Sequence, residues 1–321
     1  MKAMILAAGY GTRLRPLTLE RAKPAIPLLG TPLVVRLIHK LLKVGASQFR
    51  LNLHHLPDTI ESIFRNEPYD NLPISFSYED EILGTAGGLK NNESFFDDDV
   101  FLMVNGDIAM DFDLERALAF HREQEAFATM ILFPQTSPYR YYPVRIDEQR
   151  RLCNFKETGS GGTPTDEVYV FTGAHILDPE IFDFIPSGRF YEINSEVYPA
   201  AIKAGKTIYG FPVDGYWNDL GDPQRYLEAQ RDIFNKELIN PPISISDNVH
   251  IEQGTQIGPY VSIEPGCVIE SESTIQDTIM WDNSTIMGGS SVLNCIVGAH
   301  MTVKGDQQNM IITKNGEARI E

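Results

Sequence analysis

The stretch MILAAGYGTRLRPLT, residues 4–18, decides how the first part of the chain folds. Its opening residues, Met4–Ala8, form a short apolar run that Gly9 closes, and such a run predicts a strand buried on both faces. In the loop that follows, Gly9 and Gly11 permit positive φ and a close approach of the backbone to a ligand. Successive N–H groups in such a loop can point at phosphate oxygens. The stretch therefore predicts a buried strand that leads into a phosphate-binding loop.

The distribution of charge supports an anion site in this loop. The chain of 321 residues has 44 acidic and 27 basic side chains, a net charge of −17. This balance excludes a general nucleic-acid binder and disfavours docking on an anionic membrane. Residues 1–25, in contrast, contain five cations and one acid. Arg13 there offers a planar fork and Lys23 a point charge, so both suit a phosphate ligand.

Two further features of composition bear on the compartment. No stretch approaches the ~20 apolar residues that a membrane span needs. The three cysteines are widely spaced and odd in number, so they predict neither a disulfide framework nor a zinc cluster. We therefore expect a cytoplasmic protein with no membrane partner.

Strand and helix signals alternate over the first two-thirds of the chain. This alternation implies βαβ units and an α/β fold with a Rossmann-like, mostly parallel sheet, whose ligands bind at the carboxyl ends of the strands. One predicted strand ends at Asn105-Gly106-Asp107 and so delivers an aspartate to that edge. The predicted helices are Leu33–Val44, Thr59–Phe64 and Leu114–Glu125, and the predicted strands after the first are Gln48–Leu53, Val100–Val104 and Ala128–Phe133.

The pattern changes near Pro241. Isoleucine then recurs at every sixth position, at Ile251, Ile257, Ile263, Ile269 and Ile275, before the phase slips around 277–283. A period of six fits neither an amphipathic helix nor an alternating strand, but it is typical of a hexapeptide β-helix in which three hexads make one triangular coil. We expect about three coils over 243–304, and two domains, 1–240 and 241–321.

Four further motifs follow the opening stretch and are spread over most of the chain. They are Gly84-Thr85-Ala86-Gly87-Gly88, Asn105-Gly106-Asp107, Phe171-Thr172-Gly173 and Trp217-Asn218-Asp219-Leu220-Gly221. Together with LAAGxGTRLxPLT and the Lys23-Pro24 pair, they resemble the motifs of the sugar-1-phosphate nucleotidyltransferases, also called NDP-sugar pyrophosphorylases. In that family a left-handed hexapeptide β-helix is common after the catalytic domain.

The resemblance implies an enzyme that joins an NTP to a sugar 1-phosphate and releases pyrophosphate, with Mg²⁺ as cofactor. It implies that Asp107 and Asp219 bind the metal, that Arg13 balances charge on the leaving pyrophosphate and that Lys23 lies over the phosphates. Taken singly, these aspartates and Lys23 also suit ordinary turns and solvated loops; together, in the family's order and spacing, they favour function. The residues implied in nucleotide binding are Leu6, Ala7, Gly9, Gly11, Thr12, Gly84, Thr85 and Gly88, and those implied at the sugar are Asn105, Glu157 and Gly173.

The identity of the substrates is inferred from smaller differences between the motifs of the family's members. The sequence of the Leu83–Gly87 loop and the short β-helix resemble those of mannose-1-phosphate guanylyltransferases. Pyrimidine-specific members often carry a Gln near this loop, and none occurs between Glu79 and Leu89, which favours GTP with mannose 1-phosphate. Thr158 stands where many members have a Lys after the matched Glu157, and this departure bears on the sugar.

Two alternatives stay open. One is a uridylyl- or other nucleotidyltransferase that acts on a different sugar 1-phosphate. The other is a catalytically silent regulatory subunit that binds an NDP-sugar. In each case the β-helix predicts a homo-oligomer.

Overall fold

The computed structural model describes residues 1–97, 99–135, 141–156, 158–159 and 162–320. The chain forms two compact units, each built from segments that are not contiguous in sequence. The loop after the first strand belongs to the same unit as the C-terminal repeats. The first unit comprises Met1–Gly9, Leu37–Pro57 and Phe64–Trp217, and the second comprises Tyr10–Arg36, Asp58–Ile63 and Asn218–Glu321.

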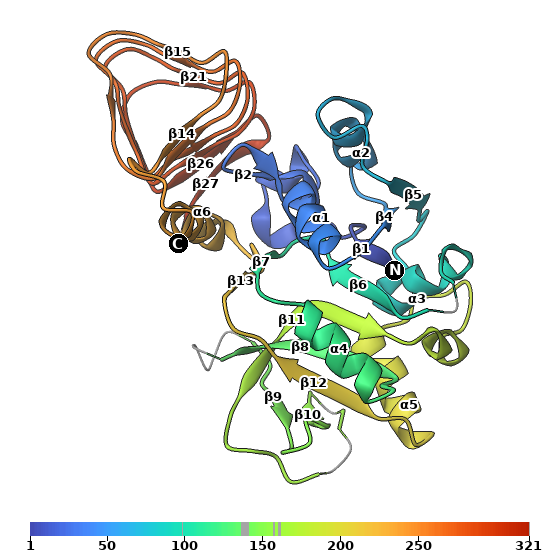
Figure 1. The fold of residues 1–321 in the computed structure, drawn as a ribbon. Helices are drawn as coiled ribbons and strands as arrows, with labels where there is room; N and C mark the ends of the chain where they lie inside the picture. Colours follow the sequence, from blue (N-terminus) through green and yellow to red (C-terminus); the bar gives the residue numbers. More distant parts are fainter. Residues whose placement is uncertain (98, 136–140, 157, 160–161, 321) are drawn as a thin grey trace. The chain divides into compact units, whose positions relative to one another are not determined.

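A nine-stranded sheet forms the centre of the described part of the first unit (Figure 1). Its strands are β1 Lys2–Leu6, β4 Gln48–Leu53, β5 Ile74–Tyr78, β6 Phe101–Asn105, β8 Ala128–Pro134, β9 Val144–Ile146, β10 Leu152–Phe155, β11 Tyr169–Leu177 and β12 Ile208–Pro212. They run in the order β10-β9-β11-β6-β1-β4-β5, with β8 beside β11 and β12 beside β8. β1 lies parallel between β4 and β6, as the opening stretch predicts. β11 is antiparallel to both β6 and β8, so the sheet is mixed and parallel around β1.

The predicted helices are confirmed within a few residues at their ends. α1 spans Leu33–Lys43, α2 Pro57–Arg65 and α4 Glu115–Glu123, and α3 Gly84–Lys90, α5 Tyr198–Lys203 and α6 Pro223–Lys236 complete the set in the described residues. The spacing of Val34, Leu37, Ile38 and Leu41 places all four on the buried face of α1. Asp222 caps the start of α6, and its carboxylate accepts a hydrogen bond from the backbone N–H of Arg225 at 2.9 Å.

The C-terminal repeats of the second unit form a left-handed hexapeptide β-helix, whose coils Figure 1 shows as a triangular stack. Its walls are three parallel sheets, β14-β17-β20-β23-β26, β15-β18-β21-β24 and β16-β19-β22-β25, and β27 returns as a hairpin on β26. Ile263, Ile269 and Ile275 point into a core that is closed to solvent. The strands are β14 Ile243–Ile245, β15 His250–Ile251, β16 Gln256–Ile257, β17 Val261–Ile263, β18 Val268–Ile269, β19 Thr274–Gln276, β20 Ile279–Met280, β21 Thr285–Ile286, β22 Ser291–Leu293, β23 Ile296–Val297, β24 Thr302–Val303, β25 Gln307–Gln308, β26 Met310–Thr313 and β27 Gly316–Arg319.

The register explains the slip in the isoleucine pattern. Ile243 pairs with Val261, eighteen positions on, whereas Ser262 pairs with Ile279, seventeen positions on. Each of the next two coils is therefore one residue shorter than the first, and the last step is shorter still, since Ile296 pairs with Ile311, fifteen positions on. The strands complete four coils up to Gln308, one more than the sequence predicts.

Among the described residues, none of the helices combines the length and apolar character that crossing a membrane requires.

Candidate functional site

The carboxyl ends of β6, β1 and β4 are in register in the first unit. Leu6 is paired with Asn105 on one side and with Asn52 on the other. The Gly106 N–H donates to the Leu6 carbonyl at 2.9 Å, and the Ala7 N–H donates to Oδ1 of Asn52 at 2.9 Å. This edge is where ligands bind in open α/β sheets. Asp107 follows directly after β6 and is partly exposed there.

Two of the predicted sugar-side residues meet at this edge. Gly173 lies in β11 at an irregularity in the pairing with β8, and its φ of 89° is in the left-handed region. A Cβ at Gly173 would come within 2.7 Å of Nδ2 of Asn105, so only glycine fits beside that amide. The preceding Thr172 accepts a hydrogen bond at its carbonyl from Nε1 of Trp217 at 2.8 Å. Glu157, the third predicted sugar-side residue, lies outside the described residues.

The glycine-rich segment 84–88 forms the start of α3, and its N–H groups are partly used within the protein. The N–H groups of Ala86 and Gly87 both donate to the carbonyl of Tyr191, at 2.9 and 3.1 Å. Oγ1 of Thr85 donates to Oε2 of Glu192 at 2.7 Å. The two amides at Ala86 and Gly87 therefore hold the 189–193 segment, so any nucleotide contact from 84–88 must come from other groups.

Beneath α3 lies a buried polar pair that sequence reasoning missed. Nδ2 of Asn52 donates to Oε1 of Glu79 at 2.7 Å, and Oε2 of Glu79 accepts from the N–H of Leu83 at 2.9 Å. A Cβ at Gly88 would come within 2.7 Å of that carboxylate, so this glycine makes room for the pair. Because Asn52 also holds the Ala7 N–H, the pair ties the end of β1 to the start of α3. No sequence motif marks Asn52 or Glu79; the glycine at 88, predicted from the sequence to bind nucleotide, is the one signal that could have pointed to them.

The second unit holds the predicted cationic residues Arg13 and Lys23. Gly11 has a φ of 61°, and its carbonyl accepts hydrogen bonds from the Leu14 N–H at 3.0 Å and from Oγ1 of Thr18 at 2.9 Å. The short helix Thr12–Leu14 follows, and Arg13 on it is exposed. Lys23, in contrast, is only 7% exposed, and its Nζ donates to the backbone carbonyl of Asp219 at 3.1 Å. The structure thus brings Lys23 and Asp219 together.

The carboxylate of Asp219 forms an ion pair with Arg225, whose side chain is 4% exposed. Gly221 allows this approach, since a Cβ there would come within 2.4 Å of Nη1 of Arg225. Arg225 also lies 3.5 Å from the carboxylate of Asp222, the cap of α6. The orientation of Asp219 is therefore fixed from the first turn of α6.

The carboxylates of Asp107, in the first unit, and Asp219, in the second, are hard oxygen donors of the kind that Mg²⁺ prefers. Within the described residues there is no group of three or more His, Cys, Asp or Glu side chains that could form an all-protein metal site. Mg²⁺ does not need one, because it binds through one or two carboxylates together with waters and substrate phosphates. A carboxylate offers about four lone-pair sites on two oxygens, so the ion pair with Arg225 leaves Asp219 chemically able to coordinate a metal as well.

The predicted residues divide between the two units. The first unit holds Leu6, Ala7, Gly9, Gly84, Thr85, Gly88, Asn105, Asp107 and Gly173, and the second holds Gly11, Thr12, Arg13, Lys23 and Asp219.

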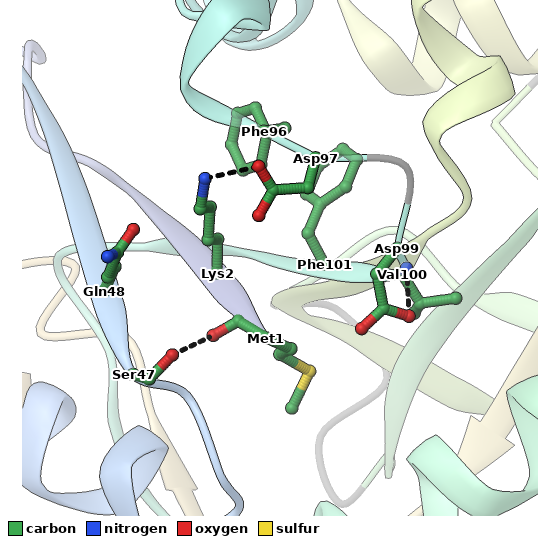
Figure 2. Close-up of a pocket in the computed structure, with 9 residues that line it drawn as sticks. All are labelled: Met1, Lys2, Ser47, Gln48, Phe96, Asp97, Asp99, Val100 and Phe101. Atoms are coloured by element: carbon green, nitrogen blue, oxygen red, sulfur yellow. Dashed lines mark hydrogen bonds and ion pairs between the residues drawn. The ribbon is translucent and has the colours of Figure 1, made fainter.

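A cavity of about 270 Å³ lies at the opposite, amino-terminal ends of β1, β4 and β6. Figure 2 shows Lys2 reaching across it to Asp97, with Nζ and Oδ1 2.8 Å apart. The lining residues share none of the predicted site groups, so this cavity is separate from the candidate site.

Known proteins resemble the chain over its whole length. The model of the nucleotidyl transferase family matches residues 2–236, and that of the GMPPB C-terminal domain matches residues 239–314. A UTP–glucose-1-phosphate uridylyltransferase from Synechocystis sp. is 31% identical and covers 100% of this chain and 95% of its own. A mannose-1-phosphate guanylyltransferase from Mycobacterium tuberculosis is 30% identical over 82% of this chain and 77% of its own. The crystal structure of HddC from Yersinia pseudotuberculosis, complexed with GMP-PN, aligns with a TM-score of 0.61 at 24% identity, covering 72% of this chain and 99% of that one.

Proposed function

Since the chain belongs to the nucleotidyl transferase family and acts on a sugar 1-phosphate, we propose that it transfers GMP from GTP to mannose 1-phosphate. The proposed cofactor is Mg²⁺. The observation that carries the choice of substrates is the match of the C-terminal repeats to the GMPPB C-terminal domain over residues 239–314. The guanylyltransferase relative and the lack of a Gln between Glu79 and Leu89 support it.

In the proposed reaction an oxygen of the sugar phosphate attacks the α-phosphorus of the NTP. The bond from this phosphorus to the oxygen that bridges it to the β-phosphorus breaks, and pyrophosphate leaves. Such transfers depend mainly on positioning and on electrostatic stabilisation, since little covalent work falls to the protein. A bound Mg²⁺ would neutralise phosphate charge, and Asp107 and Asp219 are its proposed ligands.

The cationic side chains have distinct proposed roles. Arg13 is exposed and presents a planar fork, so we assign it to the phosphates that leave as pyrophosphate. Lys23 is buried and held by the Asp219 carbonyl, so it supplies a fixed charge next to a proposed metal ligand. The end of β1 and the loop residues Gly9, Gly11 and Thr12 are proposed to hold the nucleotide.

A second candidate function is uridylyl transfer to glucose 1-phosphate. It is favoured by the uridylyltransferase from Synechocystis sp., which is 31% identical over the full length of this chain.

The experiment that separates the two is a matrix of pyrophosphate-release assays with five NTPs and a panel of sugar 1-phosphates in the presence of Mg²⁺. The proposal predicts the highest kcat/KM for GTP with mannose 1-phosphate. A preference for UTP with glucose 1-phosphate would replace it by the second candidate. Tight binding of an NDP-sugar without turnover in any well would instead support a silent regulatory subunit.

We further propose that residues 1–240 carry catalysis and that the β-helix of 241–321 assembles a homo-oligomer. Ile245 and Ile251, which are 44% and 37% exposed, are apolar side chains on its first coil. Replacing both by Glu should lower the mass measured by light scattering, and an unchanged oligomer would exclude this surface as the contact.

A further inference from the structure

We propose that Arg21 is a positioning residue for nucleotidyl transfer, because it fastens the loop that carries Arg13 and Lys23 to the β-helix. This inference rests on the proposed function, since it concerns the same site. We call residues Tyr10–Gly30 the cationic loop. The cationic loop and the β-helix belong to one compact unit, so their contacts can be described directly.

The side chain of Arg21 lies against two neighbouring residues of the β-helix. Its guanidinium forms an ion pair with Asp282, and its centre is 4.7 Å from the centroid of the Trp281 ring. Trp281 is closed to solvent, whereas the side chains of Arg21 and Asp282 are 23% and 29% exposed. A guanidinium stacked on an indole and paired with a carboxylate has lost much of its freedom of rotation. The contact therefore fixes the position of the backbone at residue 21.

The same tryptophan holds the loop at a second point. Nε1 of Trp281 donates to the hydroxyl of Tyr226 at 3.2 Å, and that hydroxyl donates to the carbonyl of Pro27. Both Trp281 and Tyr226 are 0% exposed. Positions 21 and 27 of the cationic loop are thus tied to one buried aromatic pair, and Lys23 lies between them in the chain.

Glu20 adds a third attachment. Its Oε1 accepts a hydrogen bond from the N–H of Lys314 at 3.0 Å, and its Oε2 accepts one from the N–H of Ala299 at 3.2 Å. A Cβ at Gly298 would come within 2.9 Å of the same carboxylate, so the β-helix leaves space for it. Two consecutive loop residues of opposite charge therefore each bind a matching group of the β-helix.

These attachments bear on catalysis through Lys23. Its ammonium must stay beside the Asp219 carbonyl, 3.1 Å away, while the backbone is held on one side by the contact of Arg21 with the β-helix and on the other by Tyr226 of α6. Arg13 is part of the same loop. Displacement of a charged group by about 1 Å can lower the rate of a reaction by about 100-fold. Loss of the Arg21 contact should therefore lower kcat even though Arg21 itself is turned toward Trp281 and Asp282.

The test compares Arg21→Met with Arg231→Met as a matched control. Arg231 also contacts the β-helix, since its Nε donates to Oδ1 of Asp277 at 2.8 Å, but it lies on α6 and not on the cationic loop. The side chain of Arg231 is 31% exposed, close to the 23% of Arg21. The control therefore removes a comparable arginine contact without touching the loop.

Two readouts are measured on the full chain. The first is kcat for the substrate pair that the wild type uses best, which should fall by between about 10- and 100-fold in Arg21→Met and stay near the wild-type value in Arg231→Met. The second is hydrogen exchange of the amides in residues 12–26, which should be faster in Arg21→Met alone. Arg21→Lys, which keeps the charge, should recover part of the rate. Asp282→Asn removes the ion pair but leaves Arg21 in place, and it should also lower kcat. This variant replaces Arg21→Met in the test if Arg21→Met does not fold.

Unchanged kcat and unchanged exchange in Arg21→Met would overturn the inference. Equal losses in Arg21→Met and Arg231→Met would also overturn it, since they would show general destabilisation. Should the wild type transfer no nucleotide to any sugar phosphate, the proposed function fails, and the exchange experiment still decides whether the cationic loop depends on Arg21.

Discussion

Replacing Glu264 by Gln should stabilise the protein at neutral pH and leave its stability unchanged in acid. Glu264 lies on the second coil of the β-helix and is 7% exposed. Burial raises the pKa of this carboxyl from 4.5 to about 6, although the nearby Arg21 and a hydrogen bond from the backbone of Gly30 act in the opposite direction. The hydroxyl of Tyr226 and the thiol of Cys267 also interact electrostatically with it.

The magnitude and the sign follow from the two pKa values. A group whose pKa is higher in the folded state binds its proton more tightly there, so its contribution to stability is lost as the pH rises from 4.5 to about 6. At 1.36 kcal/mol per pKa unit, a difference of about 1.5 amounts to about 2 kcal/mol. Gln stays neutral at every pH. Glu264→Gln should therefore raise the free energy of unfolding by about 2 kcal/mol at pH 8 and change it little at pH 4.

The assay is urea unfolding followed by tryptophan fluorescence at pH 4, 5, 6 and 8, which reports on Trp281 in the same cluster. Glu317→Gln, on the exposed last strand, is the control and should change the free energy of unfolding little at each pH. The reasoning is refuted if Glu264→Gln has the same effect at pH 4 and pH 8, or if it destabilises the protein at pH 8.

Three other predictions concern the site, the sheet and α3. Asp107→Asn and Asp219→Asn should each abolish pyrophosphate release while circular dichroism stays that of the wild type; normal turnover in either would refute its assignment as a metal ligand. His175 is fully buried, and burial lowers its pKa to about 3. As the pH falls, His175 is therefore protonated in the unfolded chain before it is protonated in the folded one, and the free energy of unfolding decreases below pH 6.5. His175→Gln should make this decrease smaller. The same decrease in the variant and in the wild type would argue against the prediction. Gly87→Ala should lower the melting temperature, because its Cβ would come within 2.5 Å of a backbone carbonyl in the 189–193 segment, at about 1–3 kcal/mol of strain; an unchanged melting curve would contradict this packing.

The features that the sequence predicted well are those that repeat locally. The apolar run at Met4–Ala8 predicted β1, and the isoleucines from Ile251 to Ile275 predicted the β-helix, because burial of one face imposes a period on the chain. The exact ends differ, since β1 spans Lys2–Leu6, two residues earlier than expected. The number of coils was one short, and the strict six-residue period does not hold, since the step between coils falls from eighteen residues to seventeen and then to fifteen.

The features that the sequence could not predict depend on contacts between distant segments. Nothing near Gly87 indicates that the carbonyl of Tyr191, about a hundred positions later, takes two amides of α3. The Asn52–Glu79 pair joins two strand ends whose residue types are ordinary in loops. Likewise, the placement of the cationic loop with the β-helix depends on Arg21, which no period or motif distinguishes. The motifs themselves were visible in the sequence, whereas the contacts that hold those motifs in place were not.

The central claim is nucleotidyl transfer to a sugar 1-phosphate, and the position of a radioactive label tests it most directly. The enzyme is incubated with mannose 1-phosphate, Mg²⁺ and GTP labelled with ³²P at either the α- or the γ-phosphorus, with the other nucleotides and sugar phosphates in parallel, and the products are separated by chromatography. The account predicts that α-label appears in the NDP-sugar and γ-label in pyrophosphate, in equal amounts. Recovery of γ-label on the sugar, or as orthophosphate in the absence of pyrophosphatase, would contradict it.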